Sequence, residues 1–109
     1  MIACFIRYEL DPYKLAAFEE YARNWGQAIP RCGADLIGYF APHEGSATTA
    51  YGVYTIESLA AYEAYRARLR DDPLGCDNYA FSQRERFILR EDRIFLKPVS
   101  APHAPLLQP

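Results

Sequence analysis

The chain of 109 residues is predicted to fold as one α+β domain, with four strands in an antiparallel sheet and helices on one face. Two observations predict this class. Segments whose apolar residues recur at every second position alternate with segments where they recur every third or fourth position. No repeat, low-complexity tract or linker interrupts the chain before residue 98, so we expect a domain, 1–98, followed by a proline-rich tail, 99–109.

The first strand and the first helix have the clearest patterns. Residues 2–10 alternate between an apolar face and a mixed face, which is the period of a strand. Asp11 and Pro12 follow as a cap residue and a first-turn proline, so a helix is expected to start there. Pro30 and Gly33 are expected to stop it. The apolar stripe of this helix contains Leu15, Phe18, Ala22, Trp25 and Ile29.

The sequence of the rest of the domain predicts a hairpin of two strands, two more helices and a final strand. A connection with proline and glycine joins the two hairpin strands. Thr55 or Ser58 can cap the second helix, and Asp72-Pro73 both ends it and could start another. The expected bounds are 35–42 and 48–55 for the hairpin strands, 75–89 for a third, less regular helix, and 92–97 for the last strand.

Two strand–helix–strand halves with right-handed crossovers give the ferredoxin-like arrangement, a four-stranded antiparallel sheet with its helices on one face. The other face lacks a cover, and a second copy packed against it would bury its apolar residues, so we expect a homodimer. The tail is expected to contact the partner subunit through Leu106 and Leu107. The uncovered face is expected to carry Phe5 with Ile37, Tyr39 or Tyr51, depending on the register of the strands.

Composition and charge argue against several other partners. The net charge is −2 and basic residues are interleaved with acidic ones, so neither nucleic acid nor a membrane is an expected partner. Arg7 and Glu9 interrupt any apolar leader, and no apolar run reaches the length of a membrane span, so we expect a cytoplasmic protein.

Neither a metal site nor a nucleotide cofactor is expected. The three cysteines, Cys4, Cys32 and Cys76, are odd in number and far apart, which is the usage of a reducing compartment. Neither they nor His43 and His103 stand at the spacing of zinc ligands. The sequence contains no glycine-rich phosphate loop, no Gly-x-Ser-x-Gly and no dinucleotide fingerprint, so we expect no cofactor.

Several residues spread along the chain together form a pattern of characteristic spacing. They are Tyr8-Glu9-Leu10-Asp11-Pro12, Gly33, Leu36, Gly38, Phe40, Gly45, Ser58-Leu59, Leu69, Asp72-Pro73 and the ending Glu91-Asp92-Arg93-Ile94-Phe95-Leu96-Lys97-Pro98. This pattern resembles the NIPSNAP family up to Pro98. The resemblance implies a ferredoxin-like domain that pairs into a dimeric α/β barrel. In the third strand Thr48, Gly52 and Tyr54 stand where family members often have Asn, His and Trp.

The family has no settled activity. Its wider group includes cofactor-independent monooxygenases and haem-degrading enzymes as well as binding proteins, so the resemblance predicts the fold better than the function.

Four aromatic residues, Tyr8, Trp25, Tyr51 and Tyr54, are candidates for binding a small molecule. They come from the first helix and two strands, and some of them are expected to converge between helices and sheet, where related proteins hold ligands. The alternative is a packed aromatic core, which the same helical and strand periods also predict.

Two polar residues are further candidates. His43 is the only imidazole inside the domain and therefore the candidate general base, although a lone loop histidine is also compatible with a solvated side chain. Arg7 and Glu9 point the same way on the first strand. They could bind a carboxylate or polarise a carbonyl of a substrate, or they could pair with each other or across the dimer.

Two functional hypotheses follow from these candidates. In the first, each subunit binds a small apolar or aromatic molecule in a pocket between sheet and helices and acts as a binding protein or a cofactor-independent, oxygenase-like enzyme. In the second, the dimer is a non-enzymatic protein-interaction module. A pocket of a few hundred Å³ with polar groups beside Tyr or His would favour the first, and a filled core the second.

Overall fold

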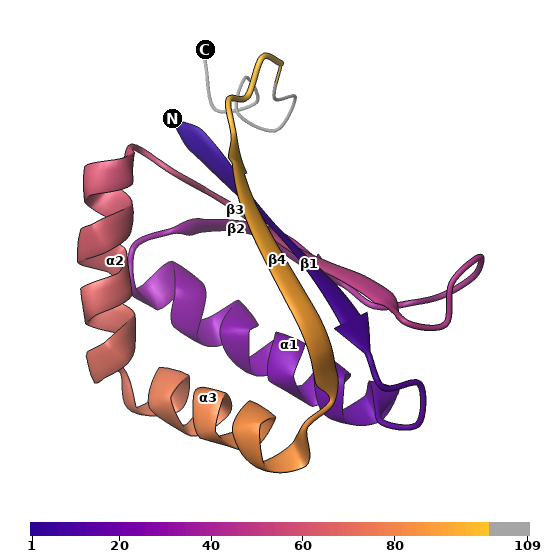
Figure 1. The fold of residues 1–109 in the computed structure, drawn as a ribbon. Helices are drawn as coiled ribbons and strands as arrows, with labels where there is room; N and C mark the ends of the chain where they lie inside the picture. Colours follow the sequence, from indigo (N-terminus) through magenta and orange to yellow (C-terminus); the bar gives the residue numbers. More distant parts are fainter. Residues whose placement is uncertain (101–109) are drawn as a thin grey trace.

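The computed structural model describes residues 1–100, which form one antiparallel sheet of four strands with three helices against one of its faces (Figure 1). The strands lie in the order β2-β3-β1-β4. This confirms the predicted ferredoxin-like α+β fold. The predicted contacts of Leu106 and Leu107 fall outside the described residues. The elements are β1 (Ile2–Leu10), α1 (Leu15–Arg31), β2 (Asp35–Phe40), β3 (Thr49–Ile56), α2 (Leu59–Asp71), α3 (Pro73–Glu85) and β4 (Ile88–Leu96).

The central strand β1 follows the predicted alternation. It pairs with β3 on one side and β4 on the other, and its residues of one face are buried under the helices. That buried face consists of Cys4, Ile6, Tyr8 and Leu10. No helix of the described part is long and apolar enough to cross a membrane.

The helix α1 begins at Leu15, four residues after the predicted start. The Asp11 carboxylate accepts a hydrogen bond from the Tyr13 amide at 2.9 Å, so the polar residue closes a turn before the helix instead of capping it. At the other end Pro30 lies inside the last turn. The helix ends after Arg31, and Gly33 takes the left-handed conformation, with φ at 108°, that leads the chain into β2.

The two helices α2 and α3 are each capped by a side chain. The Ser58 hydroxyl accepts a hydrogen bond from the Ala61 amide at 3.1 Å, which confirms one of the two predicted caps. The Asp72 carboxylate accepts from the Gly75 amide at 2.9 Å, with Pro73 at the start of α3. The predicted third helix is present, but it is a regular helix from Pro73 to Glu85, so its bounds differ from the predicted 75–89 and it lacks the predicted irregularity.

The last strand, β4, begins at Ile88, before the predicted 92. The charged residues of this strand interrupt its apolar alternation, so the sequence pattern did not predict the start. Because β4 is an edge strand, charges on it are tolerated, and it pairs with β1 until Ile88 lies opposite Leu10.

The sheet face away from the helices has an apolar half and a polar half. In the register of the sheet Phe5 lies between Val53 and Ile94, which makes an apolar row across three strands. Tyr51, one of the alternatives that depended on the register, lies on the same face. Tyr39 does not, because a register shift between Leu36 and Gly38 turns it toward the helices and takes Ile37 out of the pairing.

Candidate binding cavity

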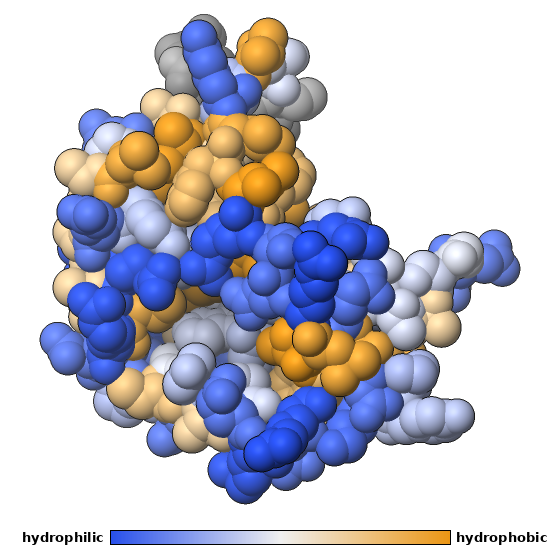
Figure 2. Space-filling model, viewed as in Figure 1, coloured by the Kyte–Doolittle hydropathy of each residue, from blue (hydrophilic) through white to orange (hydrophobic). Residues whose placement is uncertain are grey.

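A cavity of about 560 Å³ lies between the helices and the inner face of the sheet. Every strand and every helix contributes to its wall. Figure 2 shows the molecule hollowed between α2, α3 and β4, with hydrophilic residues along the edges of the hollow. The volume is typical of small-molecule sites, which span roughly 300–1,000 Å³. The aromatic residues of the wall are Tyr8, Tyr21, Trp25, Tyr39, Tyr54, Tyr65 and Tyr79.

Two tyrosine hydroxyl groups meet at this wall. The hydroxyl oxygens of Tyr8 and Tyr39 lie 3.2 Å apart, within hydrogen-bond distance, although β3 separates their strands. The residue of β3 that pairs with Tyr39 is Gly52. A Cβ atom at Gly52 would lie 2.7 Å from the Tyr39 ring. Glycine is therefore what allows the Tyr39 ring to cross β3 toward Tyr8.

The aromatic rings of the wall also pack against one another. Trp25 and Tyr21, one turn apart on α1, meet edge to face with ring centroids 5.7 Å apart. Tyr54 and Tyr65, from β3 and α2, lie 5.4 Å apart between centroids. The packed aromatic core and the pocket between helices and sheet, which the sequence left as alternatives, are both present. The same buried rings form part of the core and line the cavity.

Burial keeps the inner tyrosines neutral. It raises the pKa of each of them, for Tyr21 to about 12. At neutral pH their hydroxyl groups therefore carry a proton and can donate hydrogen bonds. The tyrosines affected are Tyr8, Tyr21, Tyr39, Tyr54 and Tyr65.

Arginines from two elements meet at the outer part of the cavity. Arg66 of α2 and Arg93 of β4 both line it, and both donate a hydrogen bond to the Tyr62 hydroxyl, at 2.6 and 3.1 Å. Arg93 also pairs with Glu91 at 3.0 Å. Arg70 is a further arginine of the wall. The cavity thus combines aromatic surface with a cationic part.

The structure brings together three of the four aromatic residues predicted to share a pocket. Tyr8, Trp25 and Tyr54 line the cavity, and Tyr51 does not. Tyr51 is opposite Arg7 in the β1–β3 register, and both point to the uncovered face of the sheet, because neighbouring residues of a strand alternate between faces. The assignment of Tyr51 and Arg7 to a pocket between helices and sheet is therefore corrected.

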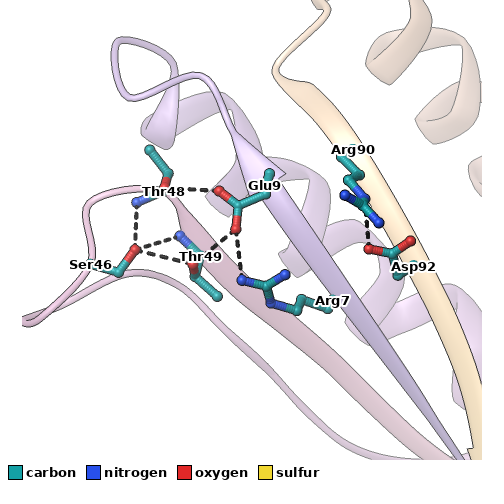
Figure 3. A network of polar contacts seen from close by, with 7 residues as sticks. All are labelled: Arg7, Glu9, Ser46, Thr48, Thr49, Arg90 and Asp92. Atoms are coloured by element: carbon teal, nitrogen blue, oxygen red, sulfur yellow. Dashed lines mark hydrogen bonds and ion pairs between the residues drawn. The ribbon is translucent and has the colours of Figure 1, made fainter.

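Arg7 belongs to a polar network on that uncovered face (Figure 3). Its guanidinium pairs with Glu9 at 3.0 Å, which is the alternative that the sequence left open. The Glu9 carboxylate also accepts hydrogen bonds from the hydroxyls of Thr48 and Thr49, at 3.0 and 3.1 Å. The Arg7 guanidinium is thus already paired with the Glu9 carboxylate.

The candidate base His43 lies in the loop between β2 and β3, where it is exposed. It is not among the residues that line the cavity. Within residues 1–100 no three His, Cys, Asp or Glu side chains are grouped as metal ligands. The cavity therefore offers tyrosine hydroxyls, and not an imidazole, for contacts with a bound molecule.

The chain is similar in sequence and in fold to known proteins. The NIPSNAP family model matches residues 3–102. The chain belongs to the NIPSNAP family. No curated protein matches it in sequence.

Solved structures similar to this NIPSNAP chain share its fold. A protein from Agrobacterium tumefaciens is 21% identical with a TM-score of 0.78, over 91% of this chain and 94% of its own. A NIPSNAP domain protein from Burkholderia xenovorans is 22% identical with a TM-score of 0.71, over 92% and 96%. A Nitrosomonas europaea protein named for the antibiotic biosynthesis monooxygenases is 12% identical with a TM-score of 0.70, over 92% and 100%. At these identities the likeness extends to the fold alone.

Sequence reasoning missed several cavity residues of this NIPSNAP domain. Tyr21 stands four residues before Trp25, so the helical period that placed Trp25 could also have found it. Tyr39 could not have been found in this way, because strand period from Leu36 would place it on the opposite face. Arg66 and Arg93 meet through tertiary packing of α2 on β4, for which the sequence carries no local signal.

Proposed function

We propose that this NIPSNAP-family protein binds a small aromatic molecule in the cavity between its helices and its sheet. The observation that carries the proposal is the cavity itself, about 560 Å³ with a wall rich in aromatic rings. Apolar and aromatic walls with a few fixed polar groups are typical of small-molecule sites. Here the hydrogen-bonded hydroxyls of Tyr8 and Tyr39 supply such groups, since a ligand oxygen can replace one hydroxyl as partner of the other.

A reaction on the bound molecule is the second candidate function. It is supported by the same hydroxyl pair and by the fold shared with the Nitrosomonas europaea protein. The candidate reaction is oxygenase-like and needs no added cofactor. Tyr8 and Tyr39 donate hydrogen bonds to an oxygen atom of the substrate. Oxygen uptake with a bound aromatic compound and no added cofactor tests it. Uptake that persists in the Tyr39→Phe variant would separate the reaction from the hydroxyl pair.

We infer that the working form is a homodimer built on the uncovered sheet face. The apolar row of Phe5, Val53 and Ile94 favours contact with another apolar surface. Beside this row lie ion pairs, Arg7 with Glu9 and Arg90 with Asp92 (Figure 3). A second copy turned by a two-fold axis can place its positive groups against negative ones. An isologous pair of sheets is therefore the partner that this face fits best.

We also infer a cytoplasmic location, and the support is the state of the cysteines. Cys4, Cys32 and Cys76 are all free, and two of them are buried. Free thiols are usual in the reducing cytosol. Finding the native protein in a cytosolic fraction tests the inference.

Blocking the cavity tests the proposed binding. A panel of one- and two-ring aromatic compounds, neutral and anionic, is screened by thermal shift and isothermal titration calorimetry. A ligand in hundredfold excess over its Kd stabilises the folded protein by about 2.7 kcal/mol, which raises the Tm clearly. Gln83 is exposed and lines the cavity, so Gln83→Phe should narrow it and abolish the rise.

The matched control is Gln27→Phe, the same change at an exposed position of α1 outside the cavity. This variant should keep wild-type binding. Compounds that bind both variants equally well would show that they bind elsewhere. A panel without any hit would favour the protein-interaction module.

A further inference from the structure

Two positively charged groups share one neutral oxygen at the outer part of the cavity. The Tyr62 hydroxyl accepts hydrogen bonds from Arg66 Nη1 at 2.6 Å and from Arg93 Nη1 at 3.1 Å. Each guanidinium therefore lies within a few ångströms of the other. Like charges at such distances repel, and the repulsion is greater where protein excludes part of the water. The side chain of Arg93 is only 30% exposed.

A single carboxylate pairs with one of these two guanidinium groups. Glu91 pairs with Arg93 Nη2 at 3.0 Å, and it is the only acidic residue of the described cavity wall. The neighbouring tyrosines stay neutral because burial raises the pKa of Tyr54 and Tyr65. The bonded group of Arg66, Tyr62, Arg93 and Glu91 thus keeps one uncompensated positive charge. Arg70, which also lines the cavity, adds to the positive potential.

The uncompensated charge belongs to a guanidinium with free donors. A guanidinium has five N–H donors. In the described part of the chain Arg66 forms no ion pair, and Tyr62 is its one hydrogen-bond partner. The Nε and Nη2 atoms of Arg66 are therefore available to an oxygen anion. Arg–carboxylate pairs of this kind are among the strong hydrogen bonds of proteins.

Building on the proposed function, we propose that the aromatic ligand carries a carboxylate, which binds between Arg66 and Arg93 while its ring lies against the aromatic wall. One negative charge balances the one positive charge of the bonded group, which favours a carboxylate over a doubly charged phosphate. The carboxylate would relieve the repulsion between the two guanidinium groups, and the aromatic rings around Trp25 would hold the apolar body. The ligand class is thus an aromatic monocarboxylic acid.

A matched pair of ligands tests this assignment. Naphthoate and its uncharged counterpart naphthalenemethanol share one ring system and differ in charge. Isothermal titration calorimetry should give a Kd for naphthoate about tenfold lower, the usual scale for one charge-assisted hydrogen bond. Added salt should weaken naphthoate binding and leave naphthalenemethanol binding unchanged, because only the former depends on charge. The salt titration uses the wild-type protein, so it does not depend on how a variant folds.

Two variants locate the site of the charge. Arg66→Gln should remove the preference for naphthoate and keep the affinity for naphthalenemethanol. Arg84→Gln removes the same charge from α3 outside the cavity and should keep the tenfold preference. Equal affinity for both ligands in the wild type, or a preference that survives Arg66→Gln, would overturn the inference and leave the proposed function intact. Failure of both ligands to bind would overturn the two together.

Discussion

The Tyr39 ring packs so closely over Gly52 that a Cβ atom at that position would lie 2.7 Å from a ring carbon. The ring lies there because its hydroxyl reaches the Tyr8 hydroxyl across the intervening strand β3. The absence of a side chain at this glycine therefore allows two residues of the proposed site to come into contact.

Gly52→Ala should destabilise the protein and disturb this pair. The added methyl group must displace the Tyr39 ring, and overpacking of this kind costs about 1–3 kcal/mol in the free energy of unfolding. Gly26→Ala is the control, because the helical Gly26 has nothing within 4 Å of an added Cβ. It should stabilise the protein by about 0.5–1 kcal/mol. Urea denaturation measures both, and equal shifts would contradict the packing argument.

The stability of the protein should fall in acid partly through Asp72. A bidentate pair with Arg31 and the hydrogen bond from the Gly75 amide hold the pKa of Asp72 below its ordinary 3.8. The contribution of this carboxylate is therefore present above pH 3.8 and is lost as the pH falls through the lower folded value. Urea denaturation from neutral pH to below 3.8 should show a shallower acid loss for Asp72→Asn.

Arg31→Gln is the companion variant for this measurement. It removes the ion pair and leaves the cap of α3 in place, so it should flatten the acid loss only in part. An Asp72→Asn profile parallel to the wild type would show that this carboxylate does not contribute.

At the alkaline end the buried tyrosines should limit stability. In the unfolded chain a tyrosine ionises near its ordinary pKa of 10, whereas burial raises the pKa of Tyr21 in the folded protein to about 12. Stability is therefore complete below pH 10 and is lost as the pH rises through the folded value. Urea denaturation should show Tyr21→Phe losing less stability over this window. Tyr13→Phe changes a ring that is 93% exposed and should keep the wild-type slope.

The dimer inferred for the uncovered sheet face should depend on its apolar row. Ile94→Lys puts a charge into that row, and light scattering should then give the monomer mass of 12.5 kDa, against twice that mass for the wild type. Leu59→Lys introduces the same charge at an exposed position of α2, on the helix side, and should remain dimeric. A folded wild-type monomer would rule out the dimer.

Local signals in the sequence were sufficient to predict part of the fold. The alternation of residues 2–10 predicted β1 with its buried face, and the pair of candidate caps Thr55 and Ser58 predicted the start of α2 to within a few residues, because period and capping act locally. The same periods put Tyr8 and Trp25 on the apolar faces of the first strand and the first helix, but they did not separate Tyr54 from Tyr51. The pattern of spaced residues was sufficient to predict the family.

The other residues reach the cavity through contacts between elements that are distant in the sequence. From Leu36 the strand period would turn Tyr39 away from the helices, but one extra residue in β2 reverses the faces, and Gly52 then makes room for the ring. Arg66 and Arg93 meet because α2 packs beside the edge strand β4. Bulges and packing of distant elements depend on the whole sheet, so no local period encodes them.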